Sequence, residues 1–259
     1  MKRFLSSLAA LVLLACFLSA SCAGDPAGDP GAGDAADHET AARYVLRGYS
    51  KKEGYVYVTL GSYPTEKDGT VRPILWRVLS AGEGYAYLLS EYILEASQIH
   101  SDRNTYRSWE ESDLFAYLNG AFLEKAFTEE ERGMLSCRTE DGGLVTLITA
   151  QEMQDASLGF VNNNARRCLS TEYAKTTGLY IYSKGHKYSP WWSRTRSDTN
   201  KNQQRRVMDE GKTGRIDVQA KDLGTRPAVN IDLSAAQVLS GTGTREDPYV
   251  LAFFSPSGE

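Results

Sequence analysis

The sequence predicts an α+β domain in which short strands come first, two helices lie in the middle and further strands return at the end. Residues 55–61 and 74–79 are rich in β-branched and aromatic side chains and stop at turns that contain glycine or proline, as strands do. Between residues 112 and 131 the apolar side chains recur at helical spacing instead. Strands and helices that occupy separate stretches of a chain are typical of the α+β class.

The composition supports one folded domain. Of the 259 residues, 41% are hydrophobic and 10% are aromatic, which is enough to build a core and excludes a wholly disordered chain. Single α+β domains of about 200 residues are common, so one domain plus a leader accounts for the length. We expect the globular domain over residues 44–259.

Residues 1–21 predict a lipoprotein signal peptide. Two basic residues precede an uncharged apolar run over residues 4–18, and small residues then lead to Cys22. This pattern resembles a bacterial lipobox, which implies that Cys22 becomes the lipidated first residue of an exported protein. An uncleaved membrane anchor is the alternative, but the run is short of the about 20 residues that a spanning helix needs. We expect lipid anchoring to the cell envelope with exposure at the surface.

Residues 22–43 predict a flexible tether. They consist largely of alanine, glycine, aspartate and proline, with the triplet GDP repeated. Such a segment buries too little apolar area to offset the entropy of ordering it. It is expected to hold the domain away from the membrane.

Further strands follow from local patterns. Residues 85–89 read as a strand, and the link Gly82-Glu83-Gly84 predicts a hairpin that makes this strand an antiparallel neighbour of residues 74–79. A short strand is expected over residues 144–148. A terminal strand over residues 249–254 either pairs with an N-terminal strand or forms a sheet edge.

The middle of the chain predicts helices with identifiable starts. Ser112 can cap a helix whose apolar side chains share one face at i, i+4 and i+8 spacing, with Phe115 beside them: Leu114, Leu118 and Phe122. Thr128 and Thr149 are each followed three residues later by glutamate, the pattern of a capping box. The acidic residues here are therefore interpreted as caps rather than as a catalytic cluster.

The stretch from residue 188 to residue 233 organises the chain. It opens with Trp191 and Trp192, continues as a polar tract over residues 193–206 and returns through short strands. Between residues 184 and 226 there are eleven Lys and Arg but only five Asp and Glu, although the whole chain has a formal net charge of -4. The pattern predicts a strand, a long exposed loop and returning strands. Because side chains alternate along a strand, at least one of the two tryptophans is expected in the core.

Several motifs carry a resemblance to a known family. VTLGSYPT, PILWRVLS, LLSEYIL, WWSRTR and TRPAVNIDL occur in the order found in a large uncharacterised family of bacterial extracellular domains, a domain of unknown function that typically reads WWLRS followed by VRPAL. The resemblance spans residues 55–233, and it departs at Ser193 and Thr195, where leucine and serine are usual. More distantly the chain resembles C-type-lectin-like modules. This implies a C-type-lectin-like mixed fold with antiparallel strands, two main helices and a long late loop, and it implies no activity.

The sequence offers little for catalysis. Outside the leader, Cys137 and Cys168 are expected either to form a disulfide or to be two separate buried thiols. His38, His100 and His186 read as solvated loop residues, and no metal-ligand spacing is present. The motifs of calcium-dependent lectins are missing as well. We expect no metal site, no catalytic residues and no cofactor.

The late polar tract is the predicted recognition surface, because loops on a rigid scaffold usually carry binding. Its side chains offer donors and acceptors suited to an anionic or polyhydroxylated partner, such as a glycan or an acidic protein, whose attraction should weaken with salt. The predicted ligand-binding residues are Trp192, Arg194, Arg196, Asp198, Asn200, Asn202, Gln204 and Arg205. Arg226, before Pro227, is expected to make structural hydrogen bonds instead.

The sequence therefore favours a lipid-anchored surface module for ligand binding or adhesion. A structural envelope lipoprotein is one alternative, and the absence of a pocket near the late tract would favour it. An extracellular enzyme that shares the fold of formylglycine-generating enzymes is another, and a buried titratable cluster in a pocket would favour it. Nucleic-acid binding is disfavoured, because the basic surplus is local and the isoelectric point is about 5.6.

Overall fold

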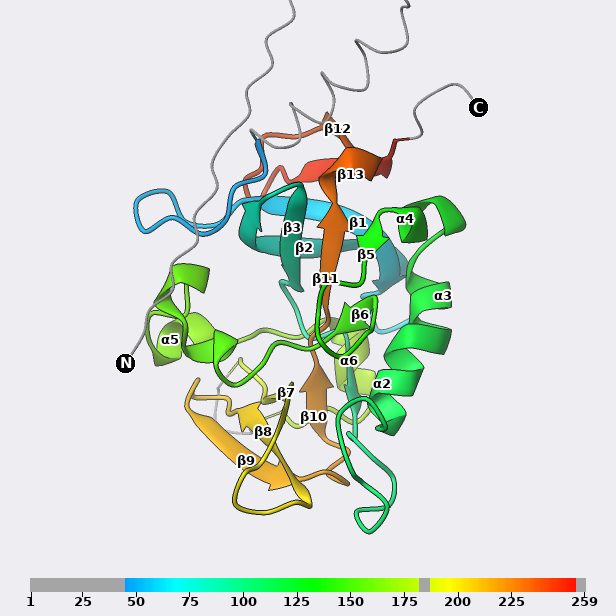
Figure 1. Cartoon of the computed structure of the whole chain (residues 1–259), viewed down its shortest axis with the longest axis vertical. Helices are drawn as coiled ribbons and strands as arrows, with labels where there is room; N and C mark the ends of the chain where they lie inside the picture. Colours follow the sequence, from blue (N-terminus) through cyan, green and yellow to red (C-terminus); the bar gives the residue numbers. More distant parts are fainter. Residues whose placement is uncertain (1–44, 182–186, 255–259) are drawn as a thin grey trace, which may run out of the picture.

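The computed structural model describes residues 45–181 and 187–254, so the predicted signal peptide, Cys22 and the tether lie outside the described residues. The described part is a mixed α+β fold with two sheets, which confirms the predicted class (Figure 1). The first sheet contains β1 (Tyr57–Pro64), β2 (Val71–Gly82), β3 (Tyr85–Ser90), β5 (Leu135–Ser136), β6 (Val145–Thr146), β11 (Ala228–Asp232), β12 (Ala236–Ser240) and β13 (Tyr249–Phe253). The second contains β4 (Glu95–Ser97), β7 (Trp191–Arg196), β8 (Gln203–Val207), β9 (Thr213–Asp217) and β10 (Leu223–Thr225).

Strand pairing is mostly antiparallel. The first sheet runs β12-β13-β1-β2-β3-β11-β5, with β6 also paired to β11, and the second runs β4-β10-β7-β8-β9. Within the described ranges, parallel pairing occurs between β1 and β13 and between β10 and β7. The terminal strand is therefore not an edge, because β13 lies between β12 and the N-terminal strand β1.

The β2–β3 hairpin forms as predicted. Its two-residue turn consists of Glu83 and Gly84, with φ angles of 55° and 83°. Two successive positive φ angles are the requirement of the type I′ turn, which matches the twist of the flanking strands. Glycine adopts such angles freely, and Glu83 is the one non-glycine residue of the described part that has a positive φ.

The helices lie beside the first sheet and begin at the predicted caps (Figure 1). Ser112 Oγ accepts from the backbone N–H of Phe115, and Thr128 and Glu131 form the full capping box. A nearly continuous helical run joins α2, a π-helical turn and α3, and it is distorted at Gly120, whose φ and ψ are -118° and -105°. The helical elements are α2 (Asp113–Tyr117), η1 (Leu118–Phe122), α3 (Leu123–Ala126), α4 (Glu129–Gly133), α5 (Asn163–Arg166) and α6 (Glu172–Thr176), with short 3₁₀ turns η2 (Glu152–Gln154), η3 (Ala156–Leu158) and η4 (Leu233–Ala235). No helix in the described ranges is long and apolar enough to cross a membrane.

Strand β7 lies between two apolar clusters. Trp192 belongs to the larger cluster, which also contains Trp76 from β2 and the helical residue Leu118. Trp191 belongs to the smaller cluster, together with Phe160. Both tryptophans are fully buried, because alternation along the strand sends each indole into a different cluster.

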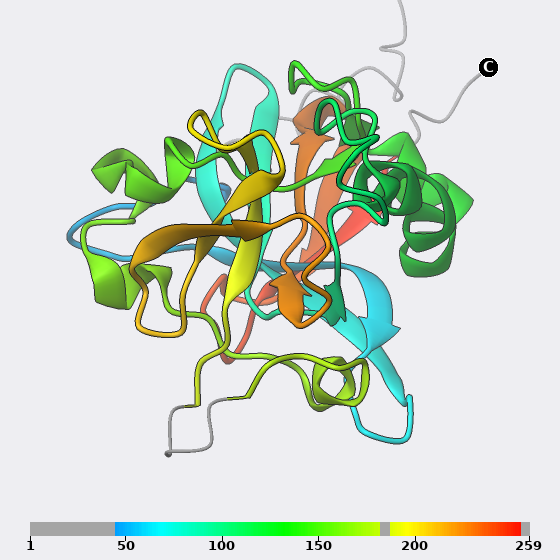
Figure 2. The same cartoon turned by 90° about the horizontal axis from the view of Figure 1, so that it is seen from below.

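The prediction of a long loop over residues 193–206 is wrong, because the loop is much shorter. Strand β7 continues to Arg196 and β8 begins at Gln203, so only residues 197–202 connect the strands of an antiparallel hairpin. Polar side chains occupy these strands because the hairpin forms part of the exposed end of the molecule, seen from below in Figure 2. Its backbone is consequently fixed by sheet pairing rather than free.

A buried charged cluster joins the two sheets. Arg226 lies between β10 and β11 and is 0% exposed; its Nε donates to the carbonyl of Ser90 at 2.8 Å, and its guanidinium lies 5.0 Å from the Trp191 ring centroid. Arg77 Nε donates to Glu91 Oε2 at 2.7 Å beside it. The predicted structural hydrogen bonding of Arg226 is thus confirmed.

The helical stripe provides the first test. Leu114, Leu118 and Phe122 are each at most 2% exposed, as the i, i+4, i+8 spacing predicted. Leu118→Ala should lower the free energy of unfolding by about 2 to 5 kcal/mol, because it removes buried methyl groups and leaves a cavity. Urea unfolding measures this, with exposed Glu124→Ala as the control that should shift stability by less than about 0.5 kcal/mol. If both substitutions lowered the free energy of unfolding by the same small amount, Leu118 would not be a buried core residue.

Candidate functional site

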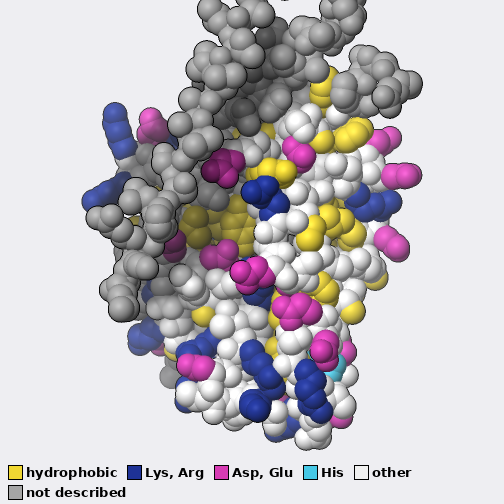
Figure 3. Space-filling view, in the orientation of Figure 1, with side chains coloured by type: hydrophobic (Ala, Val, Ile, Leu, Met, Phe, Trp, Pro, Cys, Tyr) yellow, Lys and Arg dark blue, Asp and Glu magenta, His cyan; other side chains and the backbone are white. Residues whose placement is uncertain are grey.

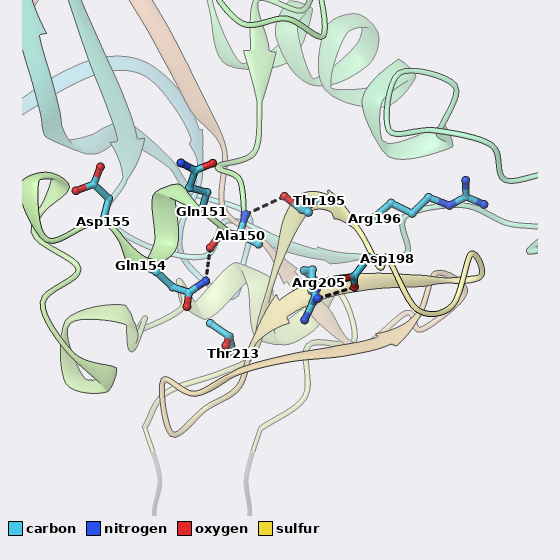
Figure 4. A pocket seen from close by; sticks show the side chains of 9 residues that line it. All are labelled: Ala150, Gln151, Gln154, Asp155, Thr195, Arg196, Asp198, Arg205 and Thr213. Carbon is cyan, nitrogen blue, oxygen red and sulfur yellow. Dashed lines mark hydrogen bonds and ion pairs between the residues drawn. The ribbon is translucent and has the colours of Figure 1, made fainter.

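The β7–β8 hairpin and residues 150–155 enclose a hollow of about 730 Å³, which we call the hairpin hollow (Figure 4). Its size falls in the range of about 300 to 1,000 Å³ typical of ligand sites. The lining is small, amide or charged: Ala150, Gln151, Gln154, Asp155, Thr195, Arg196, Asp198, Arg205 and Thr213. Because the hairpin strands supply several of these residues, a concave surface does exist beside the predicted recognition tract.

Hydrogen bonds fix the two walls of the hairpin hollow against each other. Thr195 Oγ1 accepts from the backbone N–H of Ala150 at 2.8 Å, and the Arg194 N–H donates to the carbonyl of Ile148 at 3.1 Å. The wall at residues 149–155 begins at the predicted capping box, in which Thr149 N–H donates to Glu152 Oε2 at 2.6 Å and Glu152 N–H donates to Thr149 Oγ1 at 3.0 Å. The hollow is therefore largely preformed.

Its charges are paired within the protein. Arg205 Nη2 lies 2.7 Å from Asp198 Oδ1, at the mouth of the hollow. Hydrogen bonds from backbone N–H groups and the Arg205 charge lower the pKa of Asp198. Several Lys and Arg side chains lie together at the lower end of the molecule in Figure 3. Two further ion pairs involve residues of the second sheet or its loops, Arg103–Asp217 and Lys212–Glu210. Three basic residues of the stretch therefore have acidic partners, namely Arg194 with Asp141, Arg205 with Asp198 and Lys212 with Glu210.

Arg196 serves the fold rather than the hollow. Its side chain extends away from the other lining residues in Figure 4. Its guanidinium donates to the carbonyls of Lys201, Arg107 and Tyr106 and lies 5.0 Å from the Tyr106 ring centroid. These contacts tie the tip of the hairpin to the loop over residues 101–111.

Arg194 belongs to a buried network centred on Asp141. Arg194 Nη1 lies 3.2 Å from Asp141 Oδ2, which also accepts from Trp109 Nε1 at 2.8 Å. Desolvation raises the pKa of Asp141, but hydrogen bonds from Thr139, Thr146 and Trp109, together with the charge of Arg194, outweigh it and leave the pKa below its ordinary value. The buried Asp141 carboxylate therefore fixes the orientation of the Arg194 guanidinium.

Two predicted contact residues are corrected by burial. Trp192 is 0% exposed and donates from Nε1 to the carbonyl of Ser97 at 2.8 Å. Gln204 is also 0% exposed; its Oε1 accepts from Tyr106 Oη at 2.7 Å and its Nε2 donates to the carbonyl of Ser193 at 3.0 Å. Neither side chain can reach a ligand in this conformation, so both are removed from the recognition surface.

The remaining predicted residues are divided. Asp198 and Arg205 face the hairpin hollow, whereas Asn200 and Asn202 lie at the tip of the hairpin and line none of the hollows described. Four further residues line the hairpin hollow without having been predicted from the sequence: Gln151, Gln154, Asp155 and Thr213. The capping pattern at Thr149 indicated a helical turn there, but no sequence signal placed that turn opposite β7.

Buried titratable groups occur, yet away from the hairpin hollow. Glu95 Oε2 accepts from Tyr63 Oη at 2.8 Å and from Tyr117 Oη at 3.1 Å, and desolvation raises the pKa of Glu95. Neither Glu95 nor the Arg77–Glu91 pair lines a hollow described for residues 45–181 and 187–254. Tyr87 differs from these groups, because it is buried and lines a second hollow together with Glu140, Glu152 and Asp155.

Cysteines and histidines add no reactive site in the described ranges. Both cysteines are free thiols, so the disulfide alternative is wrong. The alternative of two buried thiols is right for Cys168 and wrong for Cys137, which is exposed. Burial raises the pKa of the Cys168 thiol. His100 is not a solvated loop residue, because its Nδ1 accepts from the backbone N–H of Asp113 at 3.2 Å and its side chain is mostly buried; His38 and His186 lie outside the described residues. No group of three metal-ligating side chains occurs in the part described.

Comparison with known families accounts for much of the chain. The family described as Domain of unknown function (DUF6273) matches residues 83–233. The chain belongs to this family. The DUF6273 match ends where the resemblance predicted but begins in the β2–β3 turn rather than near residue 55, and it includes both walls of the hairpin hollow. No curated protein and no solved structure matches the chain.

The Asp141 network predicts a defined pH dependence. Asp141→Asn should lower the free energy of unfolding at pH 7, because the amide cannot replace the carboxylate toward Arg194. A carboxyl group whose pKa is lower in the folded state stabilises the protein at any pH above its unfolded-state pKa, which is about 3.9 for aspartate. This stabilisation is lost as the pH falls through the lower pKa of the folded state. The stability gap between wild type and variant should therefore narrow below about pH 4. Urea unfolding at pH 7 and pH 3 measures it, with exposed Asp247→Asn as control; a constant gap would contradict this role.

Proposed function

We propose that this DUF6273 protein is a carbohydrate-binding module that recognises a polyhydroxylated chain in the hairpin hollow. The observation that carries this proposal is the lining of the hairpin hollow. It contains amide and hydroxyl groups together with charged groups such as Arg205 and Asp198, which are paired with each other. Amide and hydroxyl groups offer donors and acceptors together, which is what sugar hydroxyls require. Side chains on paired strands and a capped turn also lose little freedom on binding.

An acidic protein partner is less well supported than a glycan. Of the arginines that predicted an anionic ligand, Arg194 is paired with Asp141, Arg205 with Asp198, and Arg196 with backbone carbonyls. A strongly anionic partner would have to compete with these internal partners. A neutral hydroxyl can add hydrogen bonds without displacing them.

A C-type-lectin-like fold and a lipid anchor are parts of the same proposal. The adjacency of β1 and β13, which brings the two ends of the domain together, and the separate small sheet that carries the late hairpin support the lectin-like assignment. The apolar leader and Cys22 support lipid anchoring. The domain would then present the hairpin hollow at the cell envelope as a binding or adhesion module rather than act as an enzyme.

Binding to defined tetrasaccharides tests the proposal. Isothermal titration of the purified protein with maltotetraose, cellotetraose, chitotetraose and tetragalacturonate should identify at least one neutral binder. Arg205→Gln should weaken that binding by about tenfold or more, since a hydrogen bond to a charged group contributes about 1.5 to 3 kcal/mol. Arg72→Gln, exposed on β2 in the other sheet, is the control and should bind as wild type does.

Salt separates the two partner classes in the same experiment. Raising salt from about 0.1 M to about 1 M shortens the screening length from ~10 Å to ~3 Å. Affinity for a neutral sugar should hardly change. Failure of all four sugars to bind would reject the proposal, and binding of tetragalacturonate alone, lost at high salt, would instead favour an anionic partner.

A further inference from the structure

A second hollow, of about 440 Å³, adjoins the hairpin hollow. Gln151 and Asp155 line both, and Figure 4 shows them on the side of the hairpin hollow opposite Arg196. The other wall comes from the first sheet, where Tyr87 of β3 is paired in register with Asn230 of β11. We call it the tyrosine hollow.

Two residues that line the tyrosine hollow, Tyr87 and Arg194, each have a buried polar atom without a hydrogen bond of normal length. Tyr87 is 9% exposed, and its Oη and the Nε of Arg194 are buried without a hydrogen-bond partner at normal distance in the described part of the chain, although the Glu152 carboxylate lies near the Tyr87 hydroxyl. Desolvation, followed by the nearby Glu152 carboxylate, raises the pKa of Tyr87, so its hydroxyl remains protonated and able to donate. Buried polar groups are nearly always paired in native proteins, and unpaired ones facing a cavity indicate a missing partner.

The charges around the hollow decide which partner fits. Arg138 and Arg194 line it, but so do Glu140, Glu152 and Asp155. A carboxylate ligand would accept from the free donors yet face three like charges. An ammonium group would suit the carboxylates, but it has no acceptor for Tyr87 or Arg194. A hydroxyl both accepts and donates, so it can satisfy the free donors and the carboxylates together.

We propose that the tyrosine hollow is a second subsite that takes a neutral sugar ring, one hydroxyl of which pairs with Tyr87 Oη and Arg194 Nε. The same oligosaccharide crosses the wall at Gln151 and Asp155 and continues into the hairpin hollow. This inference rests on the proposed function and deepens it, because it assigns chain-length selectivity to the site. A disaccharide fills one hollow, and a tetrasaccharide spans both.

Removal of one oxygen atom tests the subsite. Titration of the full chain with the three neutral tetrasaccharides and with maltose, cellobiose and chitobiose should give tighter binding of the longer chain. Tyr87→Phe should weaken tetrasaccharide binding by about tenfold, the effect of one lost hydrogen bond in a buried site. Its melting temperature should stay equal or rise, because the substitution removes an unpaired buried hydroxyl. If Tyr87 had only a structural role, its replacement would lower the melting temperature together with the affinity for the sugar.

Two further variants complete the design. Asn230→Ala alters the side chain next to Tyr87 on the same wall of the tyrosine hollow and should also reduce the preference for tetrasaccharides. Tyr173→Phe is the matched control, because Tyr173 is a half-buried residue of α6 that lines neither hollow. This variant should bind as wild type does. If Arg205→Gln weakens binding while Tyr87→Phe and Asn230→Ala do not, the second subsite is rejected and the proposed function stands. If the wild-type chain binds none of these sugars, both are rejected.

Discussion

Burial of Arg226 is the constraint on which the rest of the structure depends. Its guanidinium is 0% exposed at the point where the chain passes from the second sheet to the first, and desolvation lowers its pKa. A buried charge is tolerated only where its surroundings are fixed, because removal of a partner leaves it uncompensated. The Ser90 carbonyl, the Trp191 ring and the nearby Arg77–Glu91 pair surround the guanidinium, while its Nη1 and Nη2 have no hydrogen-bond partner within the described residues. The position of β7, and with it that of the β7–β8 hairpin, follows from this packing.

The motifs that carried the family resemblance meet at this centre. Arg77 lies in PILWRVLS, Glu91 in LLSEYIL, Trp191 in WWSRTR and Arg226 in TRPAVNIDL, although they are far apart in the chain. The signature therefore describes a structural joint rather than a ligand contact. The same motifs also contribute to the two hollows, through Thr195 and Arg196 in the hairpin hollow and through Arg194 and Asn230 in the tyrosine hollow.

Short-range physics made part of the fold predictable. The Ser112 and Thr128 caps, the Leu118 stripe and the Glu83-Gly84 turn depend on neighbours a few residues away, and each lies where the pattern placed it. The binding surface was only half predicted, because it depends on long-range contacts. Gln204 reads as an exposed polar residue in the sequence, but in the fold it is buried and accepts a hydrogen bond from Tyr106, 98 residues earlier in the chain. Tyr87 reads as an ordinary strand aromatic, and only the fold shows that its hydroxyl faces a hollow unpaired.

The central claim is that one face, built from residues 149–155 and the β7–β8 hairpin, holds a sugar chain. Hydrogen-exchange mass spectrometry with and without saturating neutral tetrasaccharide tests it directly, because bound ligand slows exchange in the backbone that it covers. The account predicts slower exchange in peptides covering residues 149–155 and 194–206. Protection confined to the hollow beside Tyr117 and Lys221, with none in those two segments, would contradict it.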